Sequence, residues 1–194
     1  MKFIGNGPDI PEKLIVEQLN GNVVFVCGAG ISCNAGMPLF KTLYDNTVEK
    51  IGLTSKEKSI VEKETLDQKC QYLESNFGNK LYVRKIVENF FRLEQEKIRK
   101  TPKKLITHKS ILTLSKNKKG LHIVTTNYEN LFEQADKEGH NIYSNTRLPE
   151  DPIKWDGIVH IHGTLNDISN IVLTSNDFGR EYVNKGCVVS FLKK

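Results

Sequence analysis

Three short polar segments each follow a run of apolar residues that is typical of a buried strand. They are Gly28–Ser32, Thr125–Asn127 and His160–Gly163. Glycines let a backbone approach a pyrophosphate closely, and N–H groups at a helix start favour anions. An amide side chain donates and accepts hydrogen bonds, and an imidazole takes a proton from a hydroxyl or water near neutral pH. The three segments together predict a nucleotide site with a general base beside it.

Alternating strands and helices must bring these segments together. We expect strands at Val23–Cys27, Gly120–Thr126, Ile158–His162 and Ile171–Thr174, the first of them buried on both faces because it is continuously apolar. Helices are expected between these strands. This alternation predicts an α/β fold, a Rossmann-like doubly wound parallel sheet with helices on both faces. Ligands of such sheets bind beyond the carboxyl ends of the strands, where the three segments lie.

The overall composition fits one domain. The chain has 194 residues, of which 38% are hydrophobic and 26% are charged, and these proportions are ordinary for a soluble globular protein. We expect a single domain over residues 1–194, with a helical insertion at about 53–116 that forms a lid or an oligomer contact. The net charge is +5, and the densest lysine run is Lys97–Lys109. That run is either a solvated helix end or a patch that steers nucleotides or nucleic acid.

Several function classes are disfavoured by what the sequence lacks. The four cysteines form no CxxC pair, which argues against a zinc ribbon and a thioredoxin-type motif. There is no apolar core of a secretion signal and no run of about 20 apolar residues, so we expect a cytoplasmic protein. Cys33 breaks the G-x-G-x-x-G fingerprint of dehydrogenases, and no lysine completes an ATP-binding P-loop.

The same segments resemble the signature of the sirtuins, the Sir2 superfamily. Gly28–Lys41 is similar to GAG-x-S-x-x-x-G-x-P-x-F-R, Thr125–Glu129 is similar to T-x-N-x-D, and His162-Gly163 matches the catalytic histidine–glycine pair. All three occur in the order found in the family. The resemblance extends from about residue 20 to residue 180.

The resemblance implies that NAD is the substrate and that its nicotinamide–ribose bond is cleaved. It implies that Ala29, Gly30 and Ser32 contact the phosphates and the adjoining ribose, and that Phe40 borders the nicotinamide pocket. Asn127 would hold the nicotinamide ribose and a water molecule, and His162 would act as general base. The full set of implied binding residues is Gly28, Ala29, Gly30, Ser32, Pro38, Phe40, Thr126, Asn127, Glu129 and Gly163.

The chain departs from the deacylating sirtuins in ways that change the expected reaction. It lacks their zinc module, so no zinc is expected, and Leu39, Lys41 and Glu129 replace an Asp, an Arg and an Asp. These changes resemble the sirtuin-like NAD hydrolases of bacterial anti-phage defence, in which water is the acceptor. The opening Gly5–Pro11 is also similar to the sirtuin-like subunit that partners a HerA-type ATPase. That resemblance implies a homo-oligomer, with DNA as a further partner.

Alternatives stay open at this point. His162 could be a structural histidine, and His160 competes with it because residues two apart on a strand point to the same face. Asn127 could be a helix N-cap, and Glu129 a surface helix residue. The domain could bind NAD or ADP-ribose without turnover, as a nucleic-acid-associated assembly module, or it could be a deacylase or ADP-ribosyltransferase. Relatives continue beyond Phe178–Tyr182 into a further strand, so we expect the C-terminal end to be truncated.

Overall fold

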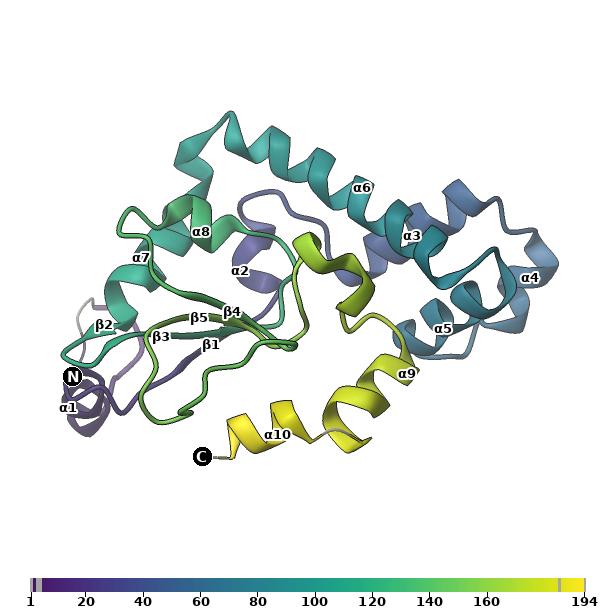
Figure 1. Cartoon of the computed structure of the whole chain (residues 1–194). Helices are drawn as coiled ribbons and strands as arrows, with labels where there is room; N and C mark the ends of the chain where they lie inside the picture. Colours follow the sequence, from purple (N-terminus) through teal and green to yellow (C-terminus); the bar gives the residue numbers. More distant parts are fainter. Residues whose placement is uncertain (1, 3–4, 185, 194) are drawn as a thin grey trace.

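A parallel sheet forms the centre of the computed structural model, which describes residues 2, 5–184 and 186–193 (Figure 1). The strand order is β1-β3-β5-β4, all parallel, and the short β2 pairs antiparallel with β3. The strands are β1 (Phe25–Cys27), β2 (Lys116–Asn117), β3 (Gly120–Thr125), β4 (Ile142–Ser144) and β5 (Gly157–His160). Cys27, Thr125 and His160 are partners in register, so the ends of β1, β3 and β5 meet at one edge.

Helices flank the sheet and build a second core beside it. The α-helices are α1 (Glu12–Leu19), α2 (Gly30–Cys33), α3 (Phe40–Ile51), α4 (Ser55–Ile60), α5 (Leu66–Asn76), α6 (Lys80–Arg99), α7 (Ile106–Ser115), α8 (Leu131–Ala135), α9 (Ser175–Phe178) and α10 (Cys187–Leu192). Two 3₁₀ segments, η1 (Pro102–Leu105) and η2 (Leu165–Asn170), and a π-helix, η3 (Gly179–Asn184), complete the set.

The sheet is covered on both faces, which confirms the predicted α/β, Rossmann-like class. On one face Ile123 and Ile158 pack with Phe132 of α8 and Ile111 of α7. On the other face the core includes Val124, Val159 and Trp155 with residues of α10, which lies below the sheet in Figure 1. Alternate residues of β3 and β5 therefore enter different cores, and both strands are buried on both faces.

Two predicted strands differ from the structure. The expectation that the first strand is buried on both faces is wrong, because β1 is the edge strand and Val26 is 71% exposed. Helix α10 covers Val124, the register partner of Val26, but does not reach the edge. No strand of the described sheet spans Ile171–Thr174. That segment is buried by packing, and the backbone N–H of Val172 donates to the carbonyl of His162 at 2.8 Å.

The helices α3, α5 and α6 pack into one core beside the sheet, together with residues that follow β3, such as Leu131, and residues that follow β5, such as Ile171. Their ends carry recognisable signals: a capping box joins Thr54 and Glu57 at the start of α4, and Gly52 ends α3 with a φ of 81°. None of the helices in the described ranges is both long enough and apolar enough to cross a membrane.

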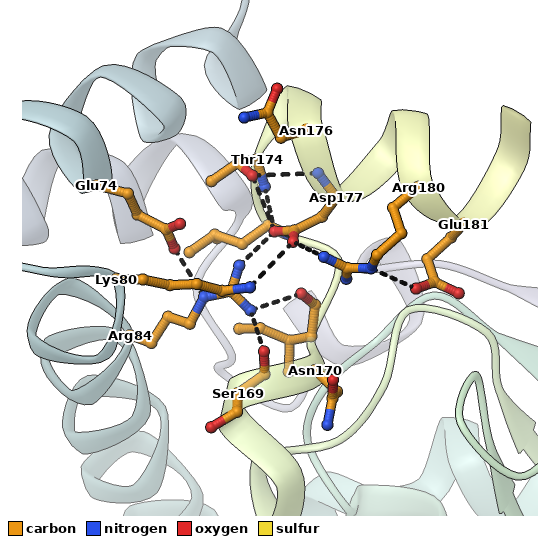
Figure 2. A network of polar contacts seen from close by, with 12 residues as sticks. Glu74, Lys80, Arg84, Ser169, Asn170, Thr174, Asn176, Asp177, Arg180 and Glu181 are labelled. Atoms are coloured by element: carbon orange, nitrogen blue, oxygen red, sulfur yellow. Dashed lines mark hydrogen bonds and ion pairs between the residues drawn. The ribbon is translucent and has the colours of Figure 1, made fainter. Parts of the chain in front are cut away.

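A buried ion network ties this helical core to the segment that follows β5 (Figure 2). Arg84 of α6, which is fully buried, donates to Glu74 at 2.7 Å and forms an ion pair with Asp177 of α9. It also donates to the backbone carbonyls of Ser169 and Ile171. The network therefore fixes η2 and α9, which flank the candidate site, against α6.

Candidate functional site

A cavity of about 190 Å³ lies where the chain leaves β1, β3 and β5. It is smaller than the roughly 300 Å³ at the lower end of sites that enclose a whole small molecule. Its lining consists of Ala29, Ser32, Met37, Pro38, Phe40, Phe91, Thr126, Asn127, Tyr128, Glu129, His162 and Phe178. The size suits a single aromatic ring rather than a whole dinucleotide.

The cavity gathers most of the residues singled out in the sequence. Ala29, Ser32, Pro38, Phe40, Thr126, Asn127, Glu129 and His162 line it. Gly28, Gly30 and Gly163 are beside it but do not line it. Gly30 is exposed, and a Cβ there would meet nothing within 4 Å, so an open surface adjoins the glycine turn.

Sequence reasoning missed four lining residues. Met37, Phe91, Tyr128 and Phe178 add apolar and aromatic surface to the cavity. Phe91 belongs to α6, and its ring meets that of Tyr128 edge to face at 5.9 Å. An apolar residue on a helix gives no signal that distinguishes a cavity wall from core. Met37 and Tyr128 lie within the quoted motifs, which was the one available signal.

Asn127 is held by its backbone and by its amide. Its backbone N–H donates to Oγ1 of Thr125 at 3.1 Å, and its Nδ2 donates to the carbonyl of Gly28 at 3.3 Å and to Oγ of Ser32 at 3.1 Å. The N-cap interpretation is wrong, because α8 begins at Leu131 and its N-cap is Asn130. Asn127 therefore joins the ends of β1 and β3.

Glu129 is buried and lines the cavity, so its interpretation as a surface helix residue is wrong. It is 5% exposed, and Ser32 donates a hydrogen bond of 2.5 Å to its Oε1. Burial raises the pKa of the carboxyl group, and the hydrogen bond from Ser32 opposes that rise. The residue is thus a nearly buried acidic group in the cavity lining.

His160 and His162 point to different surroundings, which corrects the expectation that they share a strand face. β5 ends at His160, and the chain turns before His162. Nδ1 of His160 donates to the carbonyl of Asn127 at 2.8 Å, and Nε2 lies 3.1 Å from Oε1 of Glu133. Burial lowers the pKa of His160, but the hydrogen bond and charge of Glu133 outweigh it and raise the pKa overall. His160 is thus a fully buried support for Asn127.

His162 lines the cavity and packs against two aromatic rings. Its ring meets Phe178 at 5.3 Å and Tyr182 at 5.8 Å, both edge to face, and its Nε2 lies 2.7 Å from the hydroxyl of Tyr182. Burial lowers the pKa of His162 to about 4. The ring is therefore neutral at physiological pH, which is the form that accepts a proton.

Within residues 2, 5–184 and 186–193, no three His, Cys, Asp or Glu side chains are grouped in a way that could hold a metal ion. The polar groups in the cavity lining are an amide, a carboxyl, an imidazole and the hydroxyls of Ser32, Thr126 and Tyr128.

Comparison with known proteins adds the following. Residues 121–194 match the family described as SIR2-like domain. The chain is 32% identical over 205 residues, 96% of its length, to the uncharacterized protein y4cA of Sinorhizobium fredii (strain NBRC 101917 / NGR234). It is 28% identical over 169 residues, 84% of its length, to NAD(+) hydrolase ThsA of Bacillus cereus (strain MSX-D12). It spans only 16% and 32% of these two relatives.

Proposed function

We propose that this chain is an NAD glycohydrolase domain that cleaves the nicotinamide–ribose bond with water as the acceptor. The observation that carries the proposal is that Asn127 and His162 line one cavity with aromatic walls at the carboxyl edge of a parallel sheet. The match of residues 121–194 to the SIR2-like family and the similarity to an NAD(+) hydrolase support NAD as the substrate. Residues 1–194 are proposed to act as one domain.

The chemistry needs little acid catalysis. Nicotinamide leaves a cationic ring as a neutral molecule, so the site must stabilise a sugar cation and position the acceptor. The bond between the ribose C1′ and the ring nitrogen breaks, and its electron pair stays on nicotinamide. The oxygen of water then bonds to C1′, and the proton of that water passes to a base and on to solvent. The products are nicotinamide, ADP-ribose and one proton.

Each proposed role follows from a feature of the site. The aromatic walls Phe40, Phe91 and Phe178 would exclude water from the face of a flat ring. Asn127 would bind the nicotinamide ribose and orient the attacking water. The neutral imidazole of His162 would take the proton. The exposed Gly30, with open space where a Cβ would lie, would let phosphates approach the backbone.

The biological setting is proposed from the sequence resemblance. The similarity of Gly5–Pro11 to the subunit that partners a HerA-type ATPase supports a homo-oligomer in anti-phage defence, with the ATPase and DNA as further partners. The lysines around Lys104, near Gly36, would face such polyanions. Zinc and peptide deacylation form no part of the proposal.

Release of nicotinamide from NAD tests the proposal directly. The protein in its native assembly is incubated with NAD, and the products are separated by chromatography. His162→Ala and Asn127→Ala are expected to lower kcat at least 100-fold. His140→Ala is the matched control, since His140 pairs with Asp136 outside the cavity, and it should keep kcat within twofold.

Two results would contradict the proposal. One is that the native assembly binds NAD in calorimetry but releases no nicotinamide, which would establish a binding module without turnover. The other is full activity in either cavity variant, which would remove the assigned roles of Asn127 and His162.

A further inference from the structure

The hydroxyl of Ser32, a residue that lines the cavity, is surrounded by three polar side chains. We infer that Ser32, His108 and Glu129 form a buried hub that fixes the orientation of the Asn127 amide, and that His108 is a positioning residue for the reaction. This inference rests on the proposed function. His108 belongs to α7 and was singled out by no motif.

The hydrogen atoms of the hub can be assigned from its partners. Ser32 is 1% exposed, and its Oγ donates to Oε1 of Glu129 at 2.5 Å. It accepts from Nδ2 of Asn127 at 3.1 Å, and Nε2 of His108 is a third partner at 3.1 Å. A hydroxyl has one hydrogen and two lone pairs, so His108 must donate to it. Ser32 is then saturated by protein groups and acts through Asn127 rather than by binding a ligand itself.

His108 is built to donate from Nε2. Its side chain is completely buried, its ring meets Phe132 edge to face at 5.0 Å, and its Nδ1 has no hydrogen-bond partner in the described part of the chain. An unpaired lone pair on a buried ring is more acceptable than an unpaired N–H donor. Burial also lowers the pKa of His108 to about 4, so the ring stays neutral. The neutral ring with its hydrogen on Nε2 is the form that satisfies all of these contacts.

The hub determines how the amide of Asn127 is oriented. Both hydrogens of its amide are used, one toward the carbonyl of Gly28 and one toward Ser32. A flipped amide would place Oδ1 against the Gly28 carbonyl, two acceptors in contact. Oδ1 is therefore the atom left for the cavity, where Asn127 meets its ligand as an acceptor. It would accept a hydrogen bond from the attacking water or from a ribose hydroxyl.

Steady-state kinetics distinguishes a role of His108 in positioning Asn127 from a role in the stability of the fold alone. His108→Phe keeps the ring contact with Phe132 but removes the donor, and His108→Gln keeps a donor at the ε position. We expect His108→Phe to lower kcat for nicotinamide release about tenfold with the KM for NAD within twofold, and His108→Gln to restore kcat to within threefold of wild type. His122→Phe is the matched control, because His122 is also buried against an aromatic ring, Trp155 at 5.0 Å, outside the cavity. It should leave kcat within twofold.

Full kcat in His108→Phe, or equal losses in the Phe and Gln variants, would overturn the inference. A second measurement does not depend on turnover. In ¹⁵N histidine NMR spectra at pH 7, the resonance that His108→Gln removes should show a neutral ring protonated on Nε2, and Ser32→Ala should shift it. A ring protonated on Nδ1, or a cationic ring, would overturn the hub. If wild type releases no nicotinamide while the NMR result holds, the proposed function fails and the hub stands.

Discussion

The hydroxyl of Tyr182 lies 2.7 Å from Nε2 of His162, and the two rings meet at 88°. Tyr182 belongs to η3, a π-helix, a form that frequently occurs at functional sites. The contact occupies one ring nitrogen of His162, so Nδ1 is the nitrogen left to meet a ligand. We therefore expect Tyr182 to influence the proposed reaction through His162, although it does not line the cavity.

Removal of the Tyr182 hydroxyl tests this relationship. Tyr182→Phe keeps the ring packing but releases Nε2, and one lost hydrogen bond corresponds to about a tenfold fall in kcat. Nicotinamide release measures the effect. Tyr143→Phe is the control. The Tyr143 ring packs against Trp155, with ring centroids 6.5 Å apart, and Tyr143 does not line the cavity. An unchanged kcat in Tyr182→Phe would show that the contact only fills space.

The pKa of His162 sets the acid side of the pH profile that we expect for the proposed reaction. Because burial lowers its pKa to about 4, the ring is neutral from pH 8 down to pH 5 and is protonated only near pH 4. We therefore expect kcat to show no loss centred near pH 6.5, the pKa of an ordinary histidine. Nicotinamide release at half-unit steps from pH 5 to pH 8 measures this. A twofold fall at pH 6.5 would mean that the imidazole proposed as the general base is solvated.

Arg84 should matter greatly for stability. Arg84→Met leaves Glu74 and Asp177, 7% and 2% exposed, as buried carboxylates without their main cation. We expect the free energy of unfolding in urea to fall by about 3–5 kcal/mol. Lys41→Met breaks the exposed pair with Asp45 and should change it little. Equal effects of the two substitutions would contradict the importance of burial.

Gly163 is constrained by its conformation and by its neighbours. Its φ is 81°, and a Cβ would lie 3.1 Å from Oδ1 of Asn145 and from Cα of Ile171. Gly139 has a similar φ of 74° with nothing within 4 Å of a Cβ. Gly139→Ala should therefore cost about 1–2 kcal/mol for backbone strain alone, and Gly163→Ala clearly more. Urea unfolding compares the two, and a smaller loss at Gly163 would be the opposite of this expectation.

Much of the cavity was predictable because its residues follow strand ends. Apolar runs identify β1, β3 and β5, and parallel pairing brings Cys27, Thr125 and His160 into register. Whatever follows these residues must then meet at one edge of the sheet. This is why Ala29, Asn127 and His162 line one cavity although they are far apart along the chain.

Other features depend on which elements pack together. A turn after His160 decides that His162 lines the cavity while His160 supports Asn127. The strand order leaves Val26 at an edge, although its neighbours in sequence are equally apolar. His108 reaches Ser32 only because α7 packs against α2.

The sequence by itself determined β1, β3 and β5, the glycine turn after β1 and the polar residues at these strand ends, because hydrophobic periodicity and turn chemistry act over a few neighbouring residues. Only the tertiary structure decided which histidine meets the cavity, which groups surround Ser32 and which strand lies at the edge. Those outcomes depend on contacts between residues far apart in the chain, and local sequence patterns do not reveal such contacts.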